Sequence, residues 1–315
     1  MRTKSNAIVE AQKNLLWRKR TANLLAVIGI ALGLPSQTRA IEHPSVSSTA
    51  HENSSSDILE TDIEDLMKMK VTSVSKRPEQ LSDAAAAIHV ITQEDIRRSG
   101  ATSIPEALRL SPGMEVARQD AHTWAISSRG FNDEFANQLL VLMDGRSVYT
   151  PLFAGVYWDV QDTILEDIDR IEVIRGPGAT LWGANAVNGV INVTTKSAQD
   201  TQGLLLTGGG GNEEQGFFAA RYGAKVGENG YARVYGKFSN HDESELLNGD
   251  PANDSWYMSQ GGFRYDLIPS SQNLFTLQGD IYGGQLHQQV VGVQFDAAGV
   301  PQPAIIRDNV DVSGA

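Results

Sequence analysis

The stretch Phe217-Phe-Ala-Ala-Arg-Tyr-Gly-Ala-Lys-Val226 decides the fold of the second half of this chain. Its even-numbered positions are apolar or small, whereas the odd-numbered positions include Arg221 and Lys225. Residues 231–239 repeat the alternation, and residues 263–281 continue it more loosely. Because successive side chains of a strand point to opposite faces, each segment forms a strand with one apolar face. Segments of about ten such residues predict a transmembrane β-barrel, although a soluble β-sandwich shows the same alternation.

Turn lengths favour the barrel over the sandwich. Counted from residue 203, the second turn (227–230) and the fourth (269–273) are short, whereas the third (240–256) is long and acidic. We expect another long segment after the fifth strand. Outer-membrane barrels alternate short periplasmic turns with longer external loops in this way, and only the short first turn, at residues 211–215, departs from the rule.

The residues before this region follow a different pattern, in which short strands alternate with capped helices. We expect strands at residues 89–91, 138–143, 170–174 and 190–195. Thr92 with Asp95 forms a capping box that opens one helix, and Ser103 with Glu106 opens a second. Residues 76–197 are therefore predicted to be a small α+β domain with a mixed sheet of about four strands.

The first forty residues predict an export signal. Arg18-Lys-Arg20 is basic, residues 24–34 form an apolar run, and Thr38-Arg-Ala40 offers a small residue at a cleavage point. This is the order of a secretory signal peptide, and the run is shorter than the roughly 20 residues of a membrane helix. An uncleaved anchor or a buried helix is the alternative. We assign residues 1–40 as signal peptide and residues 41–75 as a polar periplasmic linker.

Composition excludes several functional classes. The 315 residues contain no Cys, which excludes thiolate metal sites, disulfides and a cysteine nucleophile. The six His are scattered without metal-ligand spacing. Residues 1–40 hold seven basic residues and one acid, so the remainder keeps 19 basic and 37 acidic residues, a net charge of −18. Nucleic-acid phosphates would repel such a chain, and we expect no nucleic-acid partner.

A glycine-rich loop at residues 176–183 follows a predicted strand and resembles a phosphate-binding loop. Ala184-Asn185 stands where a P-loop needs Lys and Ser or Thr, and Leu181 occupies the place of the third glycine of a dinucleotide site. The glycines therefore indicate tight turns and close backbone approach rather than a nucleotide site.

Two groups of polar residues resemble catalytic sites without completing one. Asp120, His122 and Ser127 or Ser128 are the residue types of a hydrolase triad, but no G-x-S-x-G elbow accompanies them. Asp167 and Asp169 could be a carboxylate pair, but they flank the start of a strand and are expected to face solvent. We expect no enzymatic activity and no metal or cofactor held by the protein itself.

Six segments, taken in order, resemble the plug domain of TonB-dependent outer-membrane receptors. They are Val90-Ile-Thr-Gln-Glu-Asp-Ile-Arg97, Ile104-Pro-Glu-Ala-Leu108 through Pro112-Gly113, Ile126-Ser-Ser-Arg-Gly130, Leu140-Val-Leu-Met-Asp-Gly145, Ile171-Glu-Val-Ile-Arg-Gly-Pro-Gly178 and Trp182-Gly-Ala-Asn-Ala-Val-Asn-Gly-Val-Ile-Asn192. The resemblance covers about residues 70–197, and the alternating segments that follow match the start of the family's barrel.

The resemblance implies a barrel of about 22 strands whose lumen is closed by the plug. The expected fold class is an α+β plug domain with a small mixed sheet (76–197), followed by antiparallel β-strands of an incomplete transmembrane β-barrel (201–315). Those last residues supply about five strands, so we expect the chain to be an N-terminal fragment of a longer receptor.

The resemblance also assigns roles to single residues. A short box near the mature N-terminus of the family pairs as a strand with TonB in the periplasm. The matching residues here are Val71, Thr72, Ser73 and Val74, although the box more often carries an acidic residue before Thr and Val. Arg129 and Arg175 match two plug arginines that make plug–barrel contacts by pairing with glutamates of the barrel wall.

Two plug loops, at about residues 118–124 and 148–158, correspond to substrate-facing loops of the family. The candidate contact residues are Arg118, His122, Trp124, Tyr149, Phe153, Tyr157 and Trp158. Their aromatic faces suit a ring-bearing metal chelate, and packing against the barrel wall or the plug core is the alternative. Of the last two, Trp158 is expected to be the more buried.

Together with the export signal, the resemblance implies a receptor of the cell outer membrane, its plug accessible from the periplasm, that takes up a scarce nutrient with energy from TonB. A ferric siderophore is the first candidate, with cobalamin and haem as lesser ones, and the metal enters only as part of the transported chelate. The implied partners are TonB with its inner-membrane energising complex, that metal chelate or cobalamin-like molecule, and outer-membrane lipid. The alternatives are a passive porin-like channel and an exported soluble binding or adhesion protein. The plug ahead of the first strand argues against an open pore.

Overall fold

The computed structural model describes residues 70–71, 79–80, 86–130, 132–133, 135, 138–150, 152–270, 273–295 and 300–315. The predicted signal peptide and most of the predicted linker lie outside the described residues. In the described part of the chain, no helix combines the length and the apolar character that crossing a membrane requires.

Short elements make up the part of the chain before residue 200. They are β1 (Lys70–Val71), β2 (Glu79–Gln80), β3 (Ile88–Thr92), α3 (Gln93–Ser99), α4 (Ile104–Leu108), β4 (Met114–Arg118), β5 (Trp124–Ser128), β6 (Leu139–Met143), β7 (Arg146–Ser147), β8 (Tyr149–Thr150), β9 (Gly155–Val156), η2 (Trp158–Val160), η3 (Leu165–Asp167), β10 (Ile168–Arg175), α5 (Ala179–Trp182) and β11 (Gly189–Thr195).

Five of these strands form one mixed sheet in the order β3-β10-β11-β6-β7. β6 and β11 run parallel, and the other neighbours are antiparallel. The four strands expected from the sequence are thus present and adjacent. The sheet has five strands rather than about four because the Asp144-Gly145 turn returns the chain as the two-residue strand β7. The predicted α+β fold with a small mixed sheet is confirmed.

Apolar side chains cover both faces of this sheet. One face packs with α3 and α4 into the main core, which includes Ile91, Ile96, Leu108, Ile171, Val173, Ile191 and Val193. The other face forms a smaller cluster of Leu140, Leu142, Ile174, Ala186 and Val190, against which Trp182 of α5 packs. Burying each large aliphatic side chain stabilises the fold by about 1.5–3 kcal/mol. The sheet therefore holds the loops at its ends in defined positions.

The predicted capping box is complete at α3 and only half present at α4. Thr92 Oγ1 accepts a hydrogen bond from the Asp95 amide at 3.2 Å, and the Asp95 carboxylate accepts one from the Thr92 amide at 2.9 Å. At α4, Ser103 accepts from the Glu106 amide, but the Glu106 carboxylate accepts from the amide of Thr102 at 2.9 Å. The second box is therefore shifted by one residue on its return bond.

The β4–β5 hairpin is an element that we did not expect. Its strands pair from Met114 with Ser128 to Arg118 with Trp124, which leaves residues 119–123 as the turn. Asp120 takes the place of a turn glycine, because its Oδ1 accepts hydrogen bonds from the amides of His122 at 2.9 Å and Thr123 at 2.6 Å. The predicted substrate loop at residues 118–124 is this turn.

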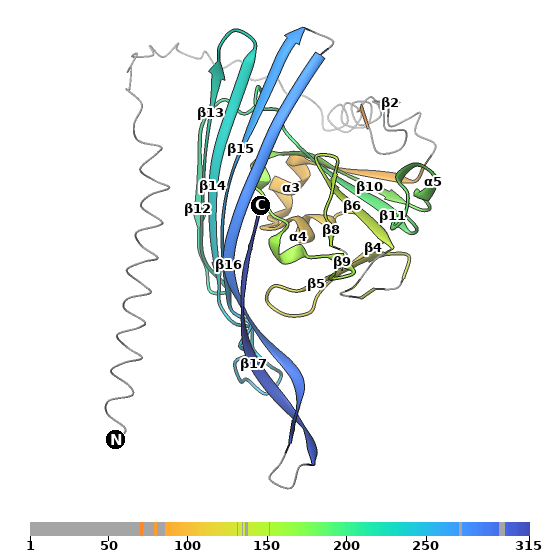
Figure 1. Cartoon of the computed structure of the whole chain (residues 1–315), viewed down its shortest axis with the longest axis vertical. Coiled ribbons are helices and arrows are strands. Elements are labelled where there is room, and N and C mark those ends of the chain that lie inside the picture. Colours follow the sequence, from red (N-terminus) through yellow and green to blue (C-terminus); the bar gives the residue numbers. More distant parts are fainter. Residues whose placement is uncertain are drawn as a thin grey trace, which may run out of the picture. The chain divides into compact units, whose positions relative to one another are not determined.

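Six consecutive strands follow as one antiparallel sheet, drawn from teal to dark blue in Figure 1. They are β12 (Gly203–Gly209), β13 (Glu214–Val226), β14 (Gly230–His241), β15 (Trp256–Ser270), β16 (Asn273–Phe295) and β17 (Pro301–Gly314). The predicted long connection after the third strand is present, at residues 242–255 between β14 and β15. The expected long segment after the fifth strand is wrong, because only residues 296–300 separate β16 from β17. Val290 pairs with Ile306 and Val291 with Ile305, so β-branched residues extend the ladder and add a sixth strand.

The six-stranded sheet has two faces of opposite character. Large apolar side chains are exposed on one face, among them Leu204, Leu206, Phe218, Tyr222, Val234, Phe263, Phe275, Leu277 and Ile281. An apolar band on the outside of tilted strands is the surface that a transmembrane barrel presents to lipid. The six-stranded sheet is here called the wall, and the mixed sheet with its loops is called the plug. The other face of the wall, here called the inner face, carries the polar members of each alternating pair and contacts the plug.

Candidate functional site

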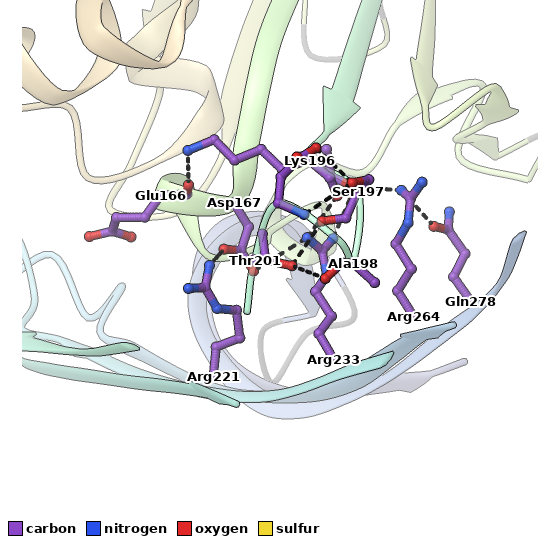
Figure 2. Close-up of polar contacts among 12 residues, drawn as sticks. Glu166, Asp167, Lys196, Ser197, Ala198, Thr201, Arg221, Arg233, Arg264 and Gln278 are labelled. Atoms are coloured by element: carbon purple, nitrogen blue, oxygen red, sulfur yellow. Dashed lines mark hydrogen bonds and ion pairs between the residues drawn. The ribbon is translucent and has the colours of Figure 1, made fainter. Parts of the chain in front are cut away.

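The contact between the plug and the inner face is built on four cationic side chains of β13, β14 and β15. These residues, here called the basic strip, are Arg221, Arg233, Lys237 and Arg264. The strand register places Arg233 directly opposite Arg264. Figure 2 shows that the three arginines, with Gln278 of β16, extend from the strands toward two plug segments, one ending at Asp167 and one beginning at Lys196. The alternation of the sequence therefore places the basic strip on one face, and the plug receives it.

Arg221 and Arg233 bind the end of the plug sheet. Arg221 forms an ion pair and hydrogen bond with the Asp167 carboxylate, which is 2% exposed. Arg233 donates to the Lys196 carbonyl at 2.8 Å and to Thr195 Oγ1 at 3.0 Å, and lies 3.7 Å from Asp167. The expectation that Asp167 faces solvent is wrong. Its position at the end of η3 turns the carboxylate toward the wall, where it offsets the cost of burying two guanidinium groups.

Lys237 and Gln260 hold the neighbouring plug segment. The ammonium group of Lys237 lies 2.6 Å from the Asp162 carboxylate and donates to the Thr163 carbonyl at 3.1 Å. The Gln260 amide donates to the Asp162 carbonyl at 3.0 Å. Both side chains thus bind the irregular segment between η2 and η3.

Arg264 completes the basic strip. It pairs with Asp266 at 2.9 Å, donates to Thr195 Oγ1 at 3.1 Å, and lies 3.9 Å from Asp144. The buried Asp266 carboxylate also accepts a hydrogen bond from the Ala198 amide at 2.7 Å, which fixes the chain where it leaves the plug. The ion pair here lies within the wall, between Arg264 and Asp266. The plug adds neutral groups, the Thr195 hydroxyl and the Ala198 amide, as well as the nearby Asp144 carboxylate.

A second contact lies at the β4–β5 turn and joins it to β15 and β16. The Ala121 amide donates to Asp254 at 2.9 Å, and the Trp256 indole donates to the Ala121 carbonyl at 3.0 Å. His122 Nε2 lies 3.1 Å from the His287 carbonyl, and its Nδ1 lies 3.1 Å from Asp159 of η2. Two plug segments and two wall strands therefore meet around one buried imidazole.

The electrostatics of this second contact favour a charged His122. Burial by itself lowers the pKa of His122, but the hydrogen bond and charge of Asp159, the charge of Asp120 and the bond to the His287 carbonyl raise it to about 8. Burial raises the pKa of the Asp159 carboxyl, against the opposing effect of His122. Because ordinary carboxyl and imidazole pKa values differ by more than two units, the proton of the pair resides on His122 at neutral pH.

Several of the predicted substrate residues are buried or paired within the protein. Trp124 and Trp158 are almost fully buried in the main core, and the Arg109 guanidinium lies 5.3 Å from the Trp124 ring centre. His122 is buried as described above, and Arg118 pairs with Glu213 at the β12–β13 turn. Trp158 is more buried than Tyr157, as expected, since Tyr157 is only partly buried.

An aromatic group lies in the second predicted loop, and one of its members was not expected. The Phe153 ring lies 5.0 Å from Phe135 and 4.9 Å from Tyr157, in the latter case edge to face. Phe135 is 49% exposed. These three residues are here called the apical aromatic cluster. Tyr149, in β8, is half-buried and lies in the same loop region.

Arg129 and Arg175 contact plug carbonyls. Arg129, with a φ of 61°, donates to the Arg175 carbonyl at 3.2 Å, and Arg175 donates to the Pro112 carbonyl at 2.8 Å. Neither guanidinium has an ion pair among the described residues, and the buried Nε of Arg175 has no hydrogen-bond partner there. Their pairing with barrel glutamates stays a prediction.

The proposed TonB-pairing segment is described only at its first residue. Val71 is fully buried in β1, where it pairs with Glu79 of β2, and Thr72, Ser73 and Val74 lie outside the described residues. Within the described ranges, no three His, Asp or Glu side chains come close enough together to hold a metal ion.

The basic strip was not predicted as a functional group, although the sequence carries its signal. Arg221, Arg233 and Lys237 each occupy the polar position of an alternating segment. Strand pairing then places them side by side, and three cations on one inner face require anions or carbonyls opposite them.

Known proteins resemble this chain in both sequence and fold. The TonB-dependent receptor plug domain family matches residues 80–190. The vitamin B12 transporter BtuB of Vibrio vulnificus is 32% identical over 147 residues, which are 46% of this chain and 23% of that protein. BtuB of Vibrio cholerae is 30% identical over 164 residues, 52% of this chain and 26% of that protein. The matched part thus spans about a quarter of the length of these relatives.

Solved structures share the fold. The pyoverdine outer-membrane receptor FpvA of Pseudomonas aeruginosa PAO1, bound to pyoverdine, superposes with a TM-score of 0.57 at 17% identity, over 75% of this chain and 34% of that one. The ferripyoverdine receptor of the same species gives 0.55 at 17% identity, over 74% and 30%. Together with the plug match, these likenesses show that residues 80–190 form a plug domain of the TonB-dependent receptor family and that the strands after it have the fold of the start of such a receptor's barrel.

Proposed function

We propose that this chain is the plug-bearing part of a receptor that imports a ring-bearing metal complex across the outer membrane with energy from TonB. The observation that carries the proposal is the docking of the plug on the basic strip. Asp167 and Thr195 of the plug are buried against Arg221 and Arg233. A plug held by buried ion pairs does not leave by itself, so transport requires work on the plug, and a passive pore is disfavoured.

The apical aromatic cluster supports the choice of a ring-bearing substrate. An edge-to-face pair with an adjoining exposed ring presents flat, polarisable surface to a ligand, and Leu152 beside it is fully exposed. Ferric siderophores with aromatic chelating groups and corrinoids both have such rings. A ferric siderophore is the first candidate, and the relatives named as vitamin B12 transporters favour cobalamin as the second.

The energy would enter through strand pairing between TonB and residues 71–74. Main-chain pairing needs an extended segment and tolerates varied side chains. Because Val71 is buried and paired with Glu79, TonB would have to displace β2 or pair beyond it. Proline at Val71 or Ser73 removes an N–H donor and should abolish uptake while substrate binding persists. Normal uptake in both variants would place the box elsewhere, with residues 62–67 as the next candidate.

A growth assay tests the proposed function. The complete receptor is expressed in a bacterial strain that lacks its own ferric siderophore and cobalamin receptors, with TonB present or deleted. We expect growth on one class of metal complex, at nanomolar supply, and only with TonB. Growth that survives deletion of TonB would contradict the proposal. Swelling of liposomes that contain the receptor would do the same, since a plugged barrel passes little solute.

A further inference from the structure

His122 joins three segments that are distant in the sequence. Its ring lies in the β4–β5 turn, with Nδ1 3.1 Å from Asp159 Oδ2 of η2 and Nε2 3.1 Å from the carbonyl oxygen of His287 in β16. The side chain is 4% exposed and that of Asp159 is 7% exposed. The two plug segments are the two predicted substrate loops or their immediate continuation, and β16 belongs to the wall.

Both partners of the ring can only accept hydrogen bonds. An ionised carboxylate and a backbone carbonyl have no proton to donate, and a neutral imidazole has one N–H. The ring therefore makes both bonds as donor only when it is doubly protonated. A neutral ring beside the ionised carboxylate would leave one of these two bonds unmade.

The other charged groups around the ring agree with a cation. In the plug, Asp120 Oδ1 lies 3.7 Å from Nδ1, and the Thr123 hydroxyl, at 3.2 Å, can donate or accept and fits either form of the ring. On the wall side, the Asp254 carboxylate binds the adjacent Ala121 amide at 2.9 Å, and the His287 ring lies 2.8 Å from the Ser255 carbonyl. The charged neighbours are thus all carboxylates, and His287 is occupied by its own strand neighbour.

We propose that His122 is a positioning residue that, as an imidazolium, fastens the β4–β5 turn and η2 to each other and to strand β16. Loss of its proton releases one of the two bonds and loosens the plug loops from the wall. The fastening itself follows from the geometry, and its consequence for uptake rests on the proposed function. The pKa of His122, which Asp159 raises to about 8 against the effect of burial, places this release on the alkaline side of neutrality.

Histidine-selective NMR of the complete receptor in detergent tests the protonation directly. The His122 signal is assigned by its absence from His122→Gln and is followed from pH 5.5 to pH 9.5. We expect it to titrate near pH 8, and the Asp159→Asn variant to lower that midpoint by about one unit, as expected for a lost charged hydrogen bond. A midpoint at or below the ordinary value of about 6.5 in the unaltered receptor would overturn the proposal.

A spin label tests the mechanical consequence. Gln119→Cys places a nitroxide on an exposed turn residue, and none of the 315 residues of this chain is Cys. We expect the label to be immobilised below pH 7 and to become mobile with the same midpoint as the NMR titration. His122→Gln should abolish this transition and leave the label mobile throughout, whereas His89→Gln, at a plug histidine outside the contact, should leave it unchanged. An unaltered transition in His122→Gln would refute the fastening role, even if the NMR midpoint were near 8.

Discussion

The basic strip and the apical aromatic cluster are two plug contacts of opposite kind. At the basic strip, cationic wall residues meet buried carboxylates and carbonyls, and Asp167 is 2% exposed. At the apical cluster, rings of plug loops contact one another and Phe135 stays about half exposed. A buried ion pair fixes position because breaking it leaves an uncompensated charge, whereas an exposed ring gains by contact with a ligand. The difference indicates that the basic strip holds the plug in place, whereas the apical aromatic cluster keeps an exposed ring available to a ligand.

Removing one carboxylate at the basic strip should have the largest effect on the plug. Asp167→Ala leaves the buried Arg221 without its counter-charge, which should cost about 3–5 kcal/mol. The urea concentration at which protease cleaves the plug of the purified receptor measures this loss.

A neighbouring residue provides the control for that substitution. Asp169 is two positions away, pairs with Arg170 and is 46% exposed, so Asp169→Ala should cost about 1 kcal/mol or less. Adding Arg221→Met to Asp167→Ala should recover part of the stability, because an apolar pair needs no counter-charge. Equal effects at residues 167 and 169 would show that the basic strip does not hold the plug.

Substitutions at the adjacent residues Tyr157 and Trp158 should distinguish a ring that contacts substrate from a ring that belongs to the core. Trp158 is 8% exposed and belongs to the main core, so Trp158→Ala should cost about 3–5 kcal/mol and reduce the amount of assembled receptor. Tyr157→Ala should leave assembly nearly normal and weaken binding of the substrate. Heat-modifiable mobility of the receptor in outer-membrane fractions reports assembly, and loss of assembly in both variants would assign Tyr157 to the core as well.

The stability of the plug should fall at alkaline pH because of His122. Its pKa in the folded chain is about 8, above the ordinary value of 6.5, so the stabilisation is complete below about pH 6.5 and is lost as pH rises through about 8. The full difference corresponds to about 2 kcal/mol. Urea midpoints of plug cleavage at pH 6, 7, 8 and 9 measure it, with His122→Gln as the variant whose profile should be flat in this range. A drop of equal size in that variant would assign the pH dependence to other groups.

The sequence predicted the architecture where a local pattern determined it. Alternation in residues 217–226 identified a strand and the face that carries Arg221. Capping at Thr92 and Asp95 identified α3, and β-branched runs identified β10 and β11. In each case the determining contacts lie within a few residues of one another or between adjacent strands.

The pairings between the plug and the wall could not be predicted in the same way. Arg221 and Asp167 are 54 positions apart, and their contact depends on how two separately formed parts dock. The β4–β5 turn was missed because Asp120, rather than glycine, makes the turn. Phe135 gave no signal, since a single aromatic residue in a loop has no periodicity that marks it as exposed or buried.

The smallest expected effect is on affinity at the apical aromatic cluster. Phe153 contacts both Phe135 and Tyr157, so Phe153→Ala removes one ring and the support of the other two. The loss should be worth roughly 0.5–1.5 kcal/mol, a several-fold to about tenfold weaker Kd for the metal complex that the growth assay identifies. Phe218→Ala makes the same change on the lipid-facing side of β13, where the ring is 53% exposed, and should leave the Kd unchanged. Quenching of intrinsic fluorescence by the bound complex gives both constants. Because Phe153 is only partly buried and lies outside the main core, assembly of the Phe153 variant should match that of the unaltered receptor. An unchanged Kd in that assembled variant would remove the cluster from the binding site.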